Sequence, residues 1–230
     1  ILLIVTLIIF IKSRSMSKGS IVRTTVNFLT FFVLFEAAIG AVIVLYEWVG
    51  LNSSLPRIIA VPIHLVNTFG LLACYAILYK VLLNNFKNIK QLWDRRFVFI
   101  AFLFLLSGAT GSITALADVL FPSASFYEGL MEDFDRTSEL LTRLRIFHPI
   151  VATALSAVLI IESRKIQKDY KIDVKLLQLL VIIAVTLGIL NVLSNIVLLL
   201  SIFHLAIADL LWITYIYVSM DKIKNKSAIN

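Results

Sequence analysis

Residues 176–199, LLQLLVIIAVTLGILNVLSNIVLL, contain no charged side chain. A helix needs about 20 apolar residues to cross the hydrocarbon core of a bilayer, and this stretch is long enough. The whole chain has the same character: 60% of its residues are hydrophobic, only 15% are charged, and its mean hydropathy is +0.97. Soluble domains are about one quarter charged, so the sequence predicts a polytopic membrane protein.

Six complete membrane spans are expected, at residues 26–47, 58–79, 97–117, 145–161, 176–199 and 203–220. The apolar stretch 1–11 is too short to cross at about 1.5 Å of rise per residue, and we interpret it as the end of a truncated helix. The predicted fold class is all-α, a transmembrane bundle of repeated helical hairpins. The single cysteine, Cys74, provides neither a disulfide framework nor a thiolate metal site.

Basic residues concentrate in alternate connections. Residues 12–23, 80–96 and 164–175, together with the C-terminal tail, hold all but four of the 21 lysines and arginines. The positive-inside rule then predicts a cytoplasmic C-terminus and an extracytoplasmic connection 118–144. The net charge of +7 therefore sets orientation and contacts anionic lipid, and nucleic acid is not an expected partner.

The connection 118–144 is rich in acidic residues and also has apolar residues at helical spacing between 126 and 134. That spacing is typical of an amphipathic helix at the membrane interface. A solvated acidic loop is the alternative interpretation.

The three histidines share one position in the predicted topology. His64, His148 and His204 each lie early on a helix that runs inward, within about two turns of the outer surface. The sequence IHLVNTFGLL around His64 also resembles FHLAIADLLW around His204, which indicates an internal repeat. Imidazoles at matched depth are what axial ligation of a haem iron between helices requires.

Other uses of these residues stay open. A zinc site is less favoured, because no HExxH or CxxC pattern is present. A proton relay is possible, because Glu36, Asp118 and Asp209 lie in or near membrane segments. Glycines on the outgoing helices allow close approach of either a neighbouring helix or a flat ligand; they are Gly40, Gly108, Gly111 and Gly188.

Two arginines, Arg143 and Arg145, precede His148 at the membrane boundary. A guanidinium fork pairs well with carboxylates, and haem carries two propionates, so both residues are candidates for cofactor binding. Snorkelling toward the interface is the alternative.

Several stretches resemble the haem A synthase family, the cytochrome-oxidase assembly proteins that convert haem O to haem A. The most specific are GSITALADVLFP (111–122) and RLRIFHP (143–149); FEAAIGAVIVLYEWVG (35–50) and FHLAIADLLWI (203–213) add to them. The resemblance covers nearly all 230 residues. Members of this family have eight transmembrane helices in two similar four-helix halves. On that pattern the chain apparently lacks the first helix and most of the second.

The resemblance implies a division of labour between residues 1–95, on the substrate-haem side, and residues 96–230, which would hold a haem b cofactor. His148 and His204 would ligate the haem b iron, and His64 would ligate the substrate haem and serve catalysis. The expected reaction oxidises the C8 methyl of haem O to the formyl of haem A. The other substrate ligand and an acidic residue near it would precede residue 1, and the cysteine pair of some members is absent.

Two other functions stay open. One is a non-catalytic di-haem cytochrome b that passes electrons from quinol, and the other is a haem transporter. The expected location is a prokaryotic plasma membrane, with the mitochondrial inner membrane as the alternative. Besides the lipid bilayer, haem O synthase or oxidase assembly factors are possible partners, and the electron donor is unknown.

The predicted orientation can be tested at Ser125, in the connection 118–144. A cysteine placed there should react with an impermeant thiol reagent in intact cells, because the connection is predicted to be extracytoplasmic. Labelling that appears only after lysis would mean the opposite orientation.

Overall fold

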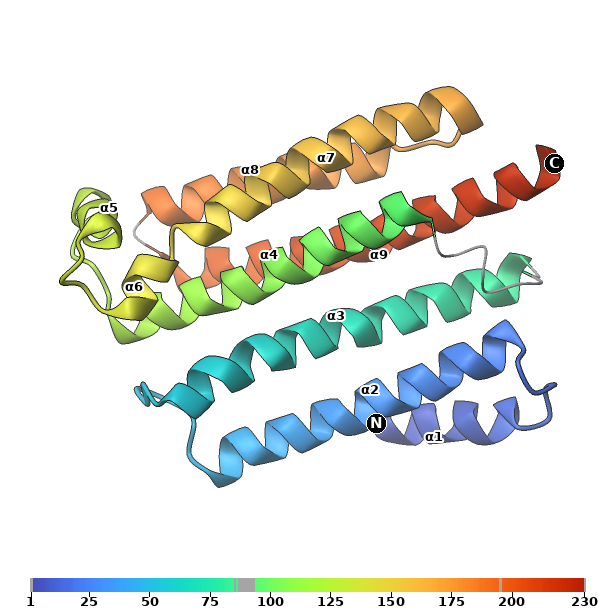
Figure 1. The fold of residues 1–230 in the computed structure, drawn as a ribbon, viewed down its shortest axis with the longest axis horizontal. Coiled ribbons are helices and arrows are strands. Elements are labelled where there is room, and N and C mark those ends of the chain that lie inside the picture. The colour runs from blue at the N-terminus through green and yellow to red at the C-terminus, as the bar shows by residue number, and fades with distance from the viewer. Residues whose placement is uncertain (1, 85, 87–93, 195, 230) are drawn as a thin grey trace.

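The fold is known from a computed structural model that describes residues 2–84, 86, 94–194 and 196–229 (Figure 1). Lys87 and Lys90 of the second basic connection lie outside the described residues. All regular structure in the described part is helical, which confirms the all-α prediction. The long helices are α2 (Ile21–Leu45), α3 (Leu55–Asn84), α4 (Arg95–Leu120), α7 (Phe147–Tyr170), α8 (Lys175–Leu193) and α9 (Leu198–Ile229).

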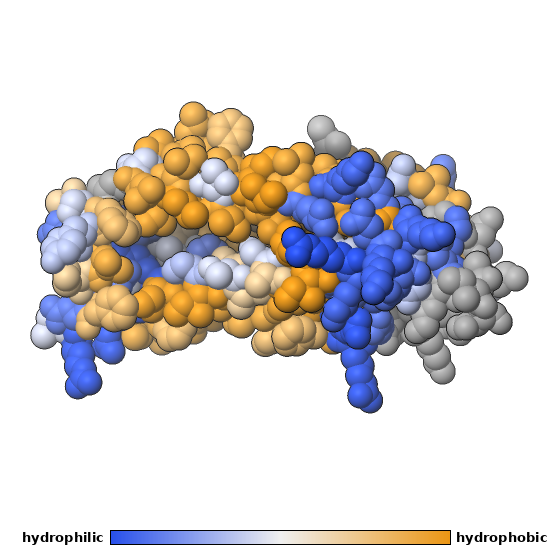
Figure 2. Space-filling model, turned by 90° about the horizontal axis from the view of Figure 1, so that it is seen from above, coloured by the Kyte–Doolittle hydropathy of each residue, from blue (hydrophilic) through white to orange (hydrophobic). Residues whose placement is uncertain are grey.

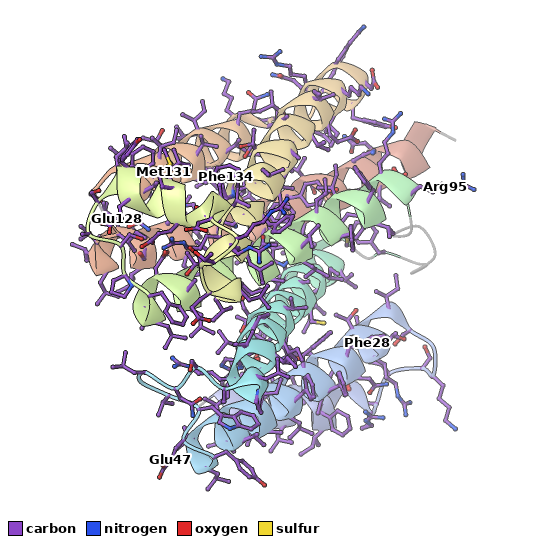
Figure 3. All side chains as sticks on the ribbon, turned by 60° about the vertical axis from the view of Figure 1, so that its left-hand side comes forward. Phe28, Glu47, Arg95, Glu128, Met131 and Phe134 are labelled. Carbon is purple, nitrogen blue, oxygen red and sulfur yellow. The ribbon has the colours of Figure 1, made fainter. Side chains whose placement is uncertain are left out.

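Six candidate membrane spans are found among the described residues, one for each long helix. All six are long and apolar enough to cross a bilayer, so the chain is an integral membrane protein. A shorter apolar helix, α1 (Leu2–Ser13), packs beside α2. Large apolar side chains of α2 such as Phe28 and Phe31 are exposed, as expected for a surface in contact with lipid. Figure 3 shows Phe28 projecting outward from α2.

The bundle has two groups of helices that meet at α3. The helices α1, α2 and α3 follow one another on one side, and α4, α7, α8 and α9 form the other group (Figure 1). Packing between the groups runs from α3 to α4 and α9. The predicted division after residue 95 falls at the start of α4.

The joint between the groups is an aromatic cluster around Trp212 of α9. Its indole Nε1 donates a buried hydrogen bond of 2.8 Å to the carbonyl of Phe69 in α3, and its ring lies 4.8 Å from that of Phe104 in α4. The Phe69 ring packs against Gly108 so closely that a Cβ there would collide with it. Glycine therefore lets α3 and α4 approach each other.

Several predicted span ends lie five or more residues from the observed ends, including the end of the span at 176–199 and the start of the span at 145–161. The span expected at 176–199 ends at Leu193, because the chain turns with Ile196 at a φ of +63° before α9 begins. The Asn191 side chain bridges this turn to Ser201 at 3.0 Å. Hydropathy alone does not show such a turn, because it lies within a continuous apolar run.

The span expected to start at residue 145 starts earlier. A short helix, α6 (Leu140–Leu144), runs into α7, and together they form the span Leu140–Tyr170. Arg145 and His148 consequently lie inside this span rather than at its first turn.

The ends of the bundle differ in charge as the topology predicts. The α1–α2 and α7–α8 connections, the last turn of α3, the first turn of α4 and the C-terminal part of α9 lie at one end, and hydrophilic residues gather there in Figure 2, beside a largely apolar middle. Lys222 of α9 pairs there with Asp94 at 3.0 Å and with Glu162 at 2.9 Å. Which end faces the cytoplasm stays a prediction.

The opposite end carries helix α5 (Phe126–Phe134), as the helical spacing in 118–144 predicts. Ser125 caps its first turn by accepting from the Glu128 backbone N–H, and the Glu128 carboxylate accepts from the N–H of Ala124. This reciprocal pattern is a typical start of a short helix. Met131 and Phe134 of α5 are 53% and 67% exposed (Figure 3).

Arg145 attaches α5 to the bundle. Its guanidinium forms ion pairs with Asp133 (2.8 Å) and Glu132 (3.2 Å) of α5 and with Asp118 (3.2 Å) at the end of α4. The Arg145 and Asp118 side chains are each only 8% exposed. Burial raises the pKa of Asp133, although the ion pair with Arg145 opposes that shift.

Replacing Arg145 with methionine should detach α5 and destabilise the protein. The change leaves the buried Asp118 carboxylate without its cation, and breaking a buried pair in this way costs about 3–5 kcal/mol. We expect a lower thermal unfolding midpoint and faster proteolysis within 121–139. Arg136→Met, at an exposed position in the same connection, is the control. Equal proteolysis of both variants would contradict the anchoring role.

Candidate functional site

Two of the three histidines face each other. His148 near the start of α7 and His204 in the second turn of α9 have ring centroids 6.2 Å apart, with the ring planes at 84°. They come from segments 56 residues apart in the sequence and lie within the group formed by α4, α7, α8 and α9. The structure thus brings these two predicted site residues together.

Each of the two rings lies on a glycine of a neighbouring helix. A Cβ at Gly111 of α4 would come 2.9 Å from Cε1 of His148. A Cβ at Gly188 of α8 would come 3.3 Å from Cε1 of His204. A side chain at Gly111 would therefore push the His148 ring away, and one at Gly188 would crowd the His204 ring. Because glycine has no side chain, the imidazole rings can lie directly against the backbone of α4 and α8.

The Nδ1 atoms of the two rings differ in their hydrogen bonding. Nδ1 of His148 lies 3.1 Å from the Ser107 carbonyl, and since a carbonyl only accepts, Nδ1 carries the proton. Nε2 is then the atom free to bind a metal. The buried Nδ1 of His204 has no hydrogen-bond partner in the structure.

The spacing of the pair suits one metal atom held between two imidazoles. Metal–nitrogen bonds of about 2 Å each place the two ligating nitrogens about 4 Å apart, with the ring centroids farther out. The observed separation of 6.2 Å fits that requirement. Within the described residues no group of three or more His, Cys, Asp or Glu side chains could hold an ion, so the pair would need a metal whose other ligands come from elsewhere.

His64 lies apart from the pair, on α3, and has a different environment. Its Nδ1 is 3.5 Å from Oε2 of Glu36 on α2. Glu36 in turn accepts hydrogen bonds from the Thr68 hydroxyl, at 2.6 Å, and from the Asn67 amide. The His64 side chain is 39% exposed, and a Cβ at Gly40 on α2 would have nothing within 4 Å. The surroundings of His64 are therefore more open than those of the pair.

Asn67 and Thr68 are site residues that the sequence analysis did not single out. They follow His64 by three and four residues, so they lie on the same face of α3. Polar residues one turn from an intramembrane histidine are the signal that could have identified them. Glu36 was singled out as a possible relay residue, but its pairing with His64 depends on how α2 packs on α3.

The remaining predicted site residues have separate surroundings. The Arg145 guanidinium is occupied by three carboxylates, and Arg143 is exposed; the role of both toward haem propionates stays a prediction. Asp209 has a buried Oδ1 without a hydrogen-bond partner. Among the described residues no hydrogen bond joins Glu36, Asp118 and Asp209 into a relay.

Comparison with known proteins gives one family and two relatives. The family model described as "Cytochrome oxidase assembly protein" matches residues 1–216. Two proteins from different strains of Thermus thermophilus, both named protoheme IX farnesyltransferase, are 27% identical to the chain over 221 residues. The match covers 92% of this chain but 36% of each relative, so the chain spans about a third of their length. No solved structure matches.

Proposed function

The chain belongs to the cytochrome oxidase assembly protein family, as its motifs predicted, and on that premise we propose that it is a haem A synthase-like membrane oxidoreductase. Its reaction would oxidise the C8 methyl of haem O to the formyl of haem A. His148 and His204 would hold a haem b, and His64 would bind the substrate haem. The cofactor, when bound, supplies the redox chemistry, and the protein supplies ligands, orientation and shielding.

The 6.2 Å separation of the His148 and His204 rings is the observation that carries the proposal. Both rings lie against glycines of neighbouring helices, and Nδ1 of His148 contacts the Ser107 carbonyl. Ligands positioned in this way by neighbouring helices suit a cofactor that stays bound through many turnovers.

His64 has the properties expected of a ligand to a substrate that enters and leaves. Its side chain is 39% exposed, and the space beside Gly40 is open. A haem bound there would be accessible from the bundle surface, whereas one held by the pair lies among four helices. This difference supports assigning the substrate to His64 and the cofactor to the pair.

The test is haem analysis after co-expression with a source of haem O. We expect haem A in the extract and a b-type signal in the reduced-minus-oxidised spectrum of the purified protein. A b-type signal without haem A would instead favour a di-haem cytochrome b, and purified protein without bound haem would favour a transporter. Formation of haem O from protohaem and a farnesyl donor would favour the activity for which the Thermus relatives are named.

The histidines should not be interchangeable. Replacing His148 or His204 with alanine would remove one of the two residues proposed to hold haem b, so haem b should be lost or loosely held. His64→Ala should keep the b-type spectrum while haem A formation stops. Equal haem loss from all three variants would contradict the proposal, because it would indicate one shared site.

The contact between the His148 ring and Gly111 provides a second prediction. Gly111→Ala should reduce the haem b content of the purified protein, since the new methyl group would come 2.9 Å from the His148 ring. Gly40→Ala adds the same methyl group at a position with nothing within 4 Å, so its haem b content should equal that of the wild type. Haem b content is measured by pyridine haemochrome spectroscopy. Equal content in all three proteins would contradict the packing of His148 on Gly111.

A further inference from the structure

The three histidine-bearing hairpins share one spacing. Each outgoing helix has a glycine and a second residue four positions before it; these pairs are Glu36 and Gly40, Ser107 and Gly111, and Ala184 and Gly188. Glu36 lies near Nδ1 of His64, and the Ser107 carbonyl lies near Nδ1 of His148. The group near Nδ1 of His148 is therefore neutral, and Nδ1 of His204 has no hydrogen-bond partner. At His64 the group near Nδ1 is the side-chain carboxylate of Glu36. The three positions thus differ in the charge that faces the imidazole.

The Glu36 carboxylate is held in place by its neighbours on α3. The Thr68 hydroxyl and the Asn67 amide both donate to it, so it functions as an acceptor for two fixed donors. Its side chain is only 24% exposed. The Nδ1 of His64 is buried and has no hydrogen-bond partner, and Oε2 of Glu36 lies 3.5 Å away. A small rotation of the ring would complete the hydrogen bond, and such contacts commonly tighten when a ligand binds.

We propose that Glu36 is the positioning residue of His64: it accepts the Nδ1–H, orients Nε2 toward the iron of the haem at this site, and places a negative charge behind that ligand. The inference rests on the proposed function. Carboxylates that accept the second N–H of a metal-binding histidine fix its tautomer and strengthen its bond to the metal. A negative charge behind the ligand also favours ferric over ferrous iron. At His148 the group near Nδ1 is a neutral carbonyl, which lacks this effect.

The competing explanation is that Glu36 only joins α2 to α3 through Asn67 and Thr68. A structural link of that kind affects folding but not the electronic properties of a haem bound at His64. The reduction potential of that haem therefore separates the two explanations, because it responds to the charge behind the ligand.

The experiment uses the full chain, purified with haem b in place, and titrates it with ferric protohaem as the probe of the His64 site. We measure the dissociation constant and the midpoint potential of this second haem. Glu36→Gln keeps the shape of the side chain but removes the charge, and we expect binding at least about 10-fold weaker and a higher potential. Glu47→Gln removes a charge from the exposed turn after α2 and should change neither (Figure 3).

Glu36→Asp provides the second variant. It keeps the charge on a shorter side chain, so affinity should fall while the potential stays nearer to that of the wild type than in Glu36→Gln. Wild-type affinity and potential in Glu36→Gln, or equal potentials in both Glu36 variants, would overturn the inference. If His64→Ala binds the second haem as the wild type does, the substrate assignment of His64 fails instead, whatever Glu36 does.

Discussion

Lipid hydrocarbon offers polar side chains no hydrogen-bond partners, so these side chains must find partners inside the bundle or at its ends. Most of the observed arrangement follows from this constraint. Arg145 gathers Asp118 and two carboxylates of α5 at one end. Lys222 joins Asp94 and Glu162 at the other. Between these ends the intramembrane polar groups near Glu36 point inward, toward α3. The polar contacts therefore mark both where the helices are attached and where a ligand could be held.

Glycine serves two purposes in this bundle through one kind of contact, a ring lying on a bare helix backbone. The rings that pack on glycines are Phe32 on Gly70, Phe69 on Gly108, His148 on Gly111 and His204 on Gly188. The phenylalanine contacts bring helices together. The histidine contacts fix imidazoles that face each other. The glycines were expected to admit either a neighbouring helix or a flat ligand; in the structure Gly108 and Gly111, on successive turns of α4, admit the side-chain rings of Phe69 and His148.

The histidines of the two groups of helices have different surroundings, although the hairpins that carry them resemble each other. The pair in the C-terminal group lies among four helices, and Nδ1 of His148 contacts a neutral backbone carbonyl. His64 is more open and lies beside a carboxylate. A cofactor that stays and a substrate that is exchanged make opposite demands on burial, and this asymmetry is what the proposed division of labour requires. It could not be read from the resemblance between the two histidine-bearing sequences.

The sequence by itself determined the class of protein, four of the six spans to within three residues of at least one end, the concentration of basic residues at one end, and the family. These properties follow from local composition, because crossing a bilayer requires only length and apolarity. Only the tertiary structure decided that His148 faces His204, that Glu36 faces His64, and that Arg145 is engaged by Asp118 and α5. In a membrane helix apolar residues cover nearly every side, so the sequence contains no clear stripe to show which face meets which neighbour. That choice depends on how side chains from distant segments fit together.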